Sequence, residues 1–149
     1  MTKFFSLIIL TIVTFLGSLI AEPQTVTIES SDLMQFDVKE FKVKAGSKVK
    51  LVFKHVGKLP KTSMGHNVVI LKKGLKAVQS GSLFMRGGSP ANDYVPESQK
   101  QNVVAHTKLI GGGEQDTIEF TAPVEAGIYE YLCTFPGHFA IMNGKMIVE

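Results

Sequence analysis

The chain has 149 residues, of which 19% are charged and 44% are hydrophobic, so it has the length and composition of one folded domain and not of a disordered tail. The net charge is only +3, and Arg86 is the one arginine among 16 basic residues, so no basic cluster favours nucleic-acid binding. The single cysteine, Cys133, excludes an internal disulfide, an iron–sulfur cluster, a zinc site built on cysteine pairs and a dinuclear copper centre bridged by two thiolates.

Residues 1–21 are predicted to be a secretory signal peptide. Lys3 gives a short basic start, and the run from Phe4 to Ala21 carries no charge and is rich in Phe, Leu and Ile. We expect cleavage after Ala21, which leaves residues 22–149 as one domain that works outside the cytoplasm without stable membrane contact. The alternative is an uncleaved anchor helix, because the uncharged run is just long enough to span a bilayer.

The rest of the chain is predicted to be all-β. Short segments alternate apolar and polar residues or are rich in β-branched and aromatic residues, and Gly, Pro, Asn and Asp separate them. The expected strands are Thr25–Glu29, Phe41–Val43, Lys48–Lys54, Asn67–Leu71, Val103–Thr107, Asp116–Phe120, Ile128–Cys133 and Lys145–Val148. This pattern favours an antiparallel sandwich or barrel. The weak helical spacing of residues 74–86 predicts one short helical excursion.

One segment near the C-terminus carries side chains suited to metal binding. Cys133, His138 and Met142 follow one another at short spacings in a loop before the last strand. Thiolate and thioether sulfurs with imidazole suit copper better than magnesium or calcium. His66, which opens an apolar strand, is the best candidate for a second imidazole, and Gly65 before it would let the backbone approach a metal closely.

Each of these residues also has a purely structural interpretation. Cys133 could be a small buried hydrophobe, Met142 a core residue and His138 an exposed turn residue. A catalytic alternative makes Cys133 a nucleophile activated by His138, but it lacks an orienting group and leaves Met142 unexplained. Taken together with His66, the residues favour a metal site. Because that site offers no open position, we expect a protein that is not an enzyme.

These motifs resemble those of azurins, which are small secreted blue-copper proteins of the cupredoxin superfamily. The resemblance extends from about Thr25 to Val148. Its strongest segments are Met34–Phe36, Leu59–Lys61, Met64–Asn67, Ala105–Gly111 and Cys133–His138 with Met142. The pattern Cys-x4-His-x3-Met has the azurin loop length, whereas plastocyanin-like relatives have a shorter Cys-to-His spacing.

The resemblance implies an eight-stranded Greek-key sandwich that holds one type 1 copper ion. The implied ligands are the equatorial His66, Cys133 and His138, the weak axial Met142 and the axial carbonyl of Gly65. The backbone N–H groups of Asn67 and Phe135 would donate hydrogen bonds to the Cys133 sulfur.

The implied function is electron transport by a soluble periplasmic carrier that cycles copper between Cu(I) and Cu(II). The alternative is a periplasmic copper chaperone or copper-storage protein on the same fold, which would need an exposed, exchangeable site. The expected partners are extracytoplasmic redox proteins such as c-type cytochromes, reductases or oxidases. We expect them to dock transiently on an apolar patch around His138 that includes Phe135, Phe139, Met64 and Leu59–Pro60.

The sequence also departs from azurins. Gln24 and Gly46–Ser47 occupy the positions of a disulfide that azurins typically hold, so the fold lacks a cross-link typically worth about 2–4 kcal/mol. The chain has no Trp, and Val68 stands where many azurins have an aromatic residue. His55 has the parity of an inward-facing strand residue and is expected to be a buried, hydrogen-bonded histidine, near the copper if the resemblance holds. His106 is expected to be a surface or packing residue.

Overall fold

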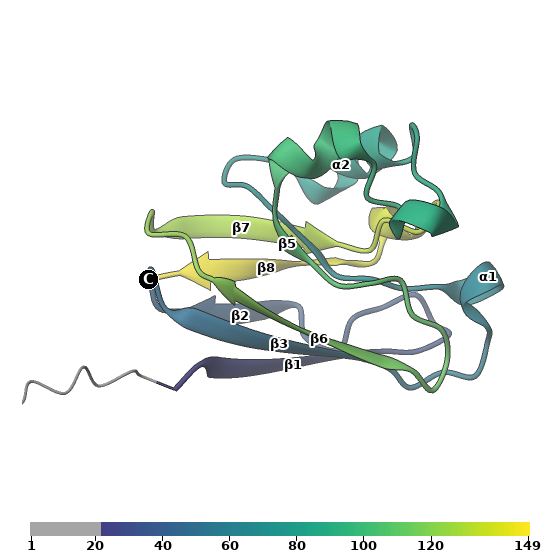
Figure 1. Ribbon diagram of the computed structural model, residues 1–149, viewed down its shortest axis with the longest axis horizontal. Coiled ribbons are helices and arrows are strands. Elements are labelled where there is room, and N and C mark those ends of the chain that lie inside the picture. The colour runs from purple at the N-terminus through teal and green to yellow at the C-terminus, as the bar shows by residue number, and fades with distance from the viewer. Residues whose placement is uncertain (1–21) are drawn as a thin grey trace, which may run out of the picture.

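The computed structural model describes residues 22–149, which form a sandwich of two β-sheets (Figure 1). The predicted signal segment, residues 1–21, lies outside the described residues. The strands are β1 (Gln24–Ser30), β2 (Glu40–Val43), β3 (Lys48–His55), β4 (Val69–Leu71), β5 (Val103–His106), β6 (Gln115–Thr121), β7 (Gly127–Leu132) and β8 (Asn143–Val148). One sheet has the order β1-β3-β6 and the other the order β2-β8-β7-β4-β5. The all-β prediction and its eight strands are confirmed.

The strand pairing is mixed, so the antiparallel arrangement that the sequence pattern favours holds for only four of the six strand pairs. β1 pairs with β3, and β2 pairs with β8, in parallel, whereas the pairs β3–β6, β7–β8, β4–β5 and β4–β7 are antiparallel. Alternation along a strand shows which face is buried but not the direction of its neighbour. β1 and β3 can run in parallel because β2, which lies between them in the chain, belongs to the other sheet.

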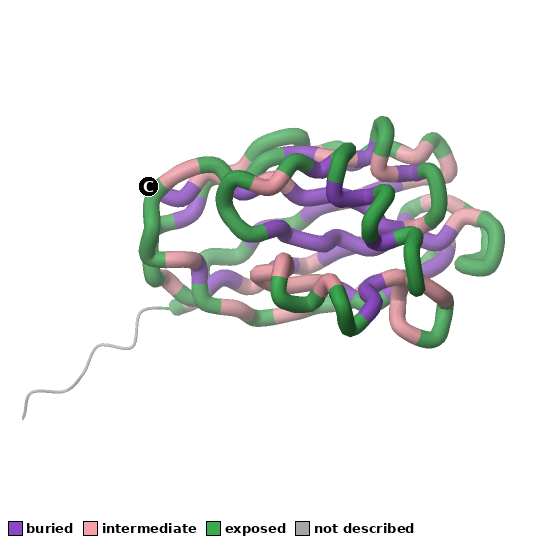
Figure 2. The backbone as a smooth tube through the Cα atoms, turned by 90° about the horizontal axis from the view of Figure 1, so that it is seen from above, coloured by how far each residue is buried: buried purple, intermediate pink, exposed green. Residues whose placement is uncertain are grey.

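The core lies between the two sheets, where the inner strands are buried (Figure 2). In β3 the residues Val49, Leu51, Phe53 and His55 are buried, and the residues between them face outward. The same core cluster continues to Cys133 and Met142 at one end of the sandwich. The predicted ligand loop is therefore packed as part of the core and is not an appendage to it.

The predicted helical excursion is α2 (Ala77–Phe84), which packs over the five-stranded sheet (Figure 1). The sequence did not predict the short helix α1 (Lys61–Met64) or the 3-10 helices η1 (Pro90–Asn92), η2 (Glu97–Asn102) and η3 (His138–Ala140). No helix within residues 22–149 has the length and apolar character needed to cross a membrane.

Phe139 is half-buried beneath α2. Its ring packs on a second apolar cluster that includes Phe84 and Leu132. Gly81 of α2 makes room for the ring, because a Cβ at that position would lie 2.1 Å from Cγ of Phe139. Phe139 therefore offers only part of its side chain to the predicted patch, because a segment distant in the chain covers its ring.

Two hydrogen bonds lie near the positions at which azurins hold a disulfide. The side-chain amide of Gln24 donates to the carbonyl of Lys42 at 2.6 Å and so ties β1 to β2. Ser47 closes the nearby turn by donating to the carbonyl of Lys44 at 2.7 Å. Each such bond contributes about 0.5–1.5 kcal/mol, so these contacts replace only part of a disulfide's stabilisation.

Candidate metal centre

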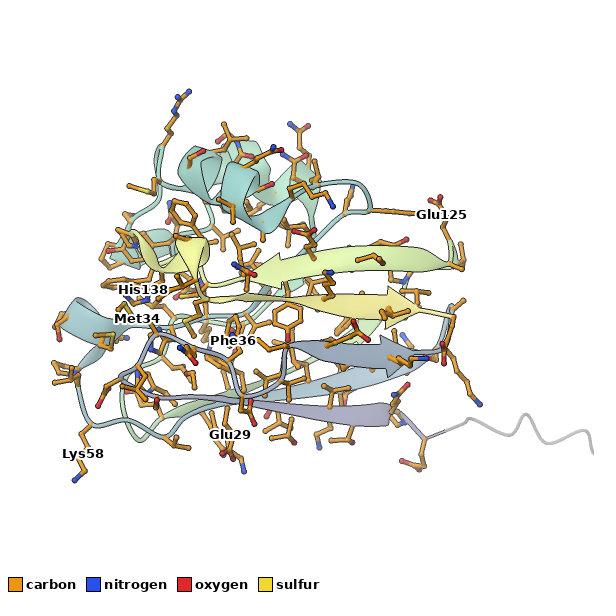
Figure 3. All side chains as sticks on the ribbon, turned by 180° about the vertical axis from the view of Figure 1, so that it is seen from behind. Glu29, Met34, Phe36, Lys58, Glu125 and His138 are labelled. Atoms are coloured by element: carbon orange, nitrogen blue, oxygen red, sulfur yellow. The ribbon has the colours of Figure 1, made fainter. Side chains whose placement is uncertain are left out.

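The three predicted equatorial ligands meet at one end of the sandwich, at which Figure 3 labels His138. Cys133 directly follows β7, and His66 precedes β4. β4 and β7 are antiparallel, with Val69 opposite Leu132, so the residues just outside these two strand ends lie side by side. His138 joins them because Gly137, with a φ of +83°, allows the turn that opens η3.

The spacing of the donor atoms suits one metal ion. Nδ1 of His66 lies 3.2 Å from Nδ1 of His138, and Sγ of Cys133 lies 3.9 Å and 3.8 Å from these two nitrogens. A triangle with these sides has a circumradius of about 2.1 Å, close to the roughly 2.0–2.3 Å bonds that nitrogen and sulfur ligands make to zinc. All three residues are buried. Two imidazoles and one thiol in trigonal array match a blue-copper donor set.

The protein fixes which nitrogen of His66 is free to bind. Nε2 of His66 lies 3.0 Å from the carbonyl oxygen of Ser31, and a carbonyl can only accept, so Nε2 carries the proton. Nδ1 is then the unprotonated nitrogen, whose lone pair can bind a metal, and it faces His138 and Cys133. A histidine that holds its second N–H on a backbone carbonyl is typical of metal sites in proteins.

Burial keeps all three donors in their neutral forms when no metal is bound. Desolvation lowers the pKa of His66 to about 4 and also lowers the pKa of His138. Desolvation raises the pKa of the Cys133 thiol to about 12, although hydrogen bonds from the backbone N–H groups of Asn67 and Phe135 oppose this. These are the two N–H groups predicted to face the sulfur. A metal that binds here must displace the thiol proton.

Met142 and Gly65, the two residues predicted to supply axial ligands, both lie next to the donor cluster. The backbone N–H of Met142 donates to the carbonyl of His138 at 2.8 Å, and Cys133 N–H donates to the carbonyl of Met142 at 3.0 Å. The Met142 side chain is fully buried in the same cluster as Cys133. The Cys133 thiol points to the carbonyl of Gly65, with Sγ 3.9 Å from the oxygen. A Cβ on Gly65 would lie 2.5 Å from the carbonyl oxygen of Lys61, so a side chain would not fit here.

Sequence reasoning missed the side chain of Asn67, which locks the two ligand segments together. Its amide nitrogen donates to Oγ1 of Thr134 at 2.8 Å and to the carbonyl of Asp93 at 2.7 Å, and its amide oxygen accepts from the backbone N–H of Thr134 at 2.8 Å. Both Asn67 and Thr134 are fully buried. The available signal was the polar Asn directly before the apolar residues 68–71, because a buried amide must find partners.

His55 is a buried, hydrogen-bonded histidine, as predicted. Its Nε2–H donates to the carbonyl of Met64 at 2.9 Å, and its Nδ1 accepts from the backbone N–H of Gly57 at 3.0 Å. Its ring stacks on the ring of His66, with 4.4 Å between centroids and 23° between planes. His106, in contrast, is half-buried on β5 and is not part of the donor cluster.

Comparison with known proteins agrees with this geometry. Residues 23–149 match the family model of copper binding proteins of the plastocyanin/azurin family. Azurin-2 of Alcaligenes xylosoxydans xylosoxydans is 44% identical, over 80% of this chain and 93% of that protein. Outer membrane protein H.8 of Neisseria gonorrhoeae is 46% identical over 80% of this chain, but this chain spans only 64% of its length. The structure of auracyanin A, a "blue" copper protein from Chloroflexus aurantiacus, superposes with a TM-score of 0.75 at 33% identity, over 86% of this chain and 100% of that one. The chain therefore belongs to the plastocyanin/azurin family of copper-binding proteins.

Proposed function

We propose that the protein is an electron carrier that holds one type 1 copper ion through His66, Cys133, His138 and Met142. The observation that carries this proposal is the buried cluster of two imidazoles and one thiol at the end of the sandwich. Copper bound there supplies a Cu(I)/Cu(II) couple. The azurin and auracyanin relatives indicate the same function.

The protein's own residues make the site rigid and dry. The Ser31 carbonyl fixes the ring of His66, and Asn67 holds the segment that follows Cys133. The ligand side chains are packed in the core, which excludes water from the donor atoms. A site whose ligands are held before and after electron transfer requires little atomic motion, which suits a carrier.

A copper chaperone or storage protein on this fold is less well supported. Such a protein must hand its ion to another protein, so its donors have to be reachable. Here His138 is the most exposed of the three donor residues, at 5%, and the other two are fully buried. A copper ion held by the four proposed ligands would also have no free coordination site for a substrate, which supports a carrier over an enzyme.

We further propose that partners dock at the rim above His138. Leu59 is 43% exposed, Pro60 and Pro136 are exposed, and Met64 is half-buried. We propose that these residues together form a small apolar surface near His138, the ligand that is nearest to solvent. The partners would be extracytoplasmic redox proteins such as c-type cytochromes, reductases or oxidases. A small patch favours the brief contact that exchange of electrons between such proteins requires. The uncharged run of residues 4–21 supports a periplasmic location after signal cleavage.

Electron self-exchange of the copper-loaded protein tests both parts of this proposal. We expect reversible exchange in the parent protein and a decrease of about tenfold or more in Met64→Lys at low salt, since opposed like charges add at least ~1.4 kcal/mol to the encounter. Val124→Lys is the matched control, because Val124 is 82% exposed and neighbours Glu125 at the opposite end (Figure 3). Equal rates in the two variants would contradict docking at this rim, and an absence of exchange in the parent would contradict the carrier function.

A further inference from the structure

We propose that Asp32 is a positioning residue of the metal centre, which fixes the Ser31 carbonyl that orients His66. Asp32 has no direct contact with the donor atoms. The inference rests on the proposed function only in taking His66 as a ligand.

The Asp32 carboxylate fastens two loops to each other. Its Oδ2 accepts from the backbone N–H of Lys58 at 2.9 Å, and its Oδ1 accepts from the backbone N–H of Leu59 at 3.2 Å. The hydrogen bond from Lys58 holds the pKa of Asp32 below its ordinary value, so the group is a charged acceptor at neutral pH. The loop after β1 is thereby tied to the loop after β3.

The tied loop contains the hydrogen-bond partner of His66. Ser31 directly precedes Asp32, and its carbonyl accepts the Nε2–H of His66 at 3.0 Å. Ser31 lies just beyond the end of β1, so the sheet ladder does not hold it in place. Its own carbonyl also accepts the backbone N–H of Met34 at 3.3 Å, and the backbone N–H of Val56 donates to the carbonyl of Ser30 at 2.7 Å. The two bonds of Asp32 add a charged tie from the residue next to Ser31 to the loop after β3. Fixing this carbonyl fixes the tautomer and the orientation of the His66 ring.

Packing beside Asp32 leaves little freedom for the loops to shift. A Cβ on Gly57 would lie 2.2 Å from Oδ1 of Asp32 and 2.5 Å from Cε1 of His55. The carboxylate therefore lies close to both Gly57 and the ring of His55, which stacks on His66. Oδ1 of Asp32 lies 3.9 Å from Nε2 of His55. Asp32 thus supports His66 in two ways, through the carbonyl of Ser31 and through the ring of His55.

Asp37 provides a matched control at the other end of the same loop. Its Oδ1 accepts from the backbone N–H groups of Glu29 at 2.6 Å and Val38 at 2.8 Å. Like Asp32, it is a carboxylate that accepts two backbone N–H groups. Neither Asp37 nor its two partners contributes a hydrogen bond to His66. Loss of either carboxylate should lower stability, but only loss of Asp32 should disturb His66.

The test compares Asp32→Ala with Asp37→Ala in the metal-free protein and with Zn²⁺, a redox-inert probe that takes the same ligands. In Asp32→Ala, nitrogen NMR of the His66 ring should show the loss of a single Nε2–H tautomer. Competition with a chelator should show Zn²⁺ affinity weakened about 10–100-fold, which is typical for loss of such outer contacts. Asp37→Ala should lower the free energy of unfolding by a similar amount, with little change in the His66 NMR signal or in the Zn²⁺ affinity.

Equal Zn²⁺ affinities in the two variants, or an unchanged His66 signal in Asp32→Ala, would overturn the proposal. If Asp32→Ala does not fold, Asp32→Asn replaces it, because the amide keeps one acceptor and loses the other. An unchanged His66 ring in Asp32→Asn would also overturn the proposal. The NMR reading needs no copper, so it is separate from failure of the carrier function, which would appear as absent electron exchange in the parent protein.

Discussion

Acidification should destabilise the metal-free protein between pH 6.5 and about pH 4, because buried His66 resists protonation. Desolvation lowers the pKa of His66 from its ordinary 6.5 to about 4 in the folded protein. In the unfolded chain the same imidazole takes up a proton below pH 6.5. Between these two values the unfolded state binds more protons than the folded state, so the free energy of unfolding falls as the pH falls.

His66 should lower the free energy of unfolding by about 3 kcal/mol at pH 4, since each pH unit between the two pKa values corresponds to about 1.36 kcal/mol. The pKa of His138 is also lowered by burial, so it should add to the loss. The pKa of Asp32 is lowered from its ordinary value of 3.8, so its carboxylate stabilises the folded protein above pH 3.8. This stabilisation is lost only as the pH falls below that value. The carboxylate effect therefore falls mostly outside the His66 window.

Urea unfolding of the metal-free protein from pH 7 to pH 4, followed by circular dichroism, measures this effect. His66→Gln is the comparison variant, because its amide cannot be protonated in this range. The parent should lose about 3 kcal/mol more than the variant across the window. A parent whose stability is flat from pH 7 to pH 4, or a variant that falls as steeply, would refute the reasoning.

Three further predictions concern single positions. Gly81→Ala should lower the free energy of unfolding by about 1–3 kcal/mol in urea titrations because the new Cβ meets Phe139, whereas Ser82→Ala on the exposed side of the same helix should change it little. Met142→Leu should keep copper and colour but show a higher reduction potential in voltammetry, since loss of a weak thioether donor disfavours Cu(II); loss of copper binding would mean that Met142 is a strong ligand. Asn67→Ala should cost about 1–3 kcal/mol because it leaves buried partners unpaired, and a parent-like unfolding midpoint would argue against that network.

The strands could be predicted because their alternation records one buried face. Val49, Leu51 and Phe53 show this in β3. The parallel pairing could not be predicted, because it depends on the sheet to which β2 belongs. α1 gave no signal, since none of its residues is buried and it has no apolar stripe. The position of Phe139 depends on the lack of a side chain at Gly81, which single-segment patterns do not reveal.

The clustering of the candidate ligands could be predicted because their chemistry is carried by side chains. Cys133 and His138 lie close in sequence, and His66 stands before an apolar strand. Ser31 could not be found in this way, since it acts through a backbone carbonyl that every residue has. Asp32 was also missed, because the N–H groups that it binds belong to a loop distant in the chain.

The visible absorption spectrum of the Cu(II)-loaded protein tests the central claim most directly. Type 1 coordination by His66, Cys133 and His138 predicts an intense thiolate-to-copper band in the parent protein. The same preparation of Cys133→Ser should lack the band, because a hydroxyl cannot replace the thiolate donor. Folded parent protein that binds Cu(II) without this band, or Cys133→Ser protein that keeps it in full, would contradict the assigned copper centre.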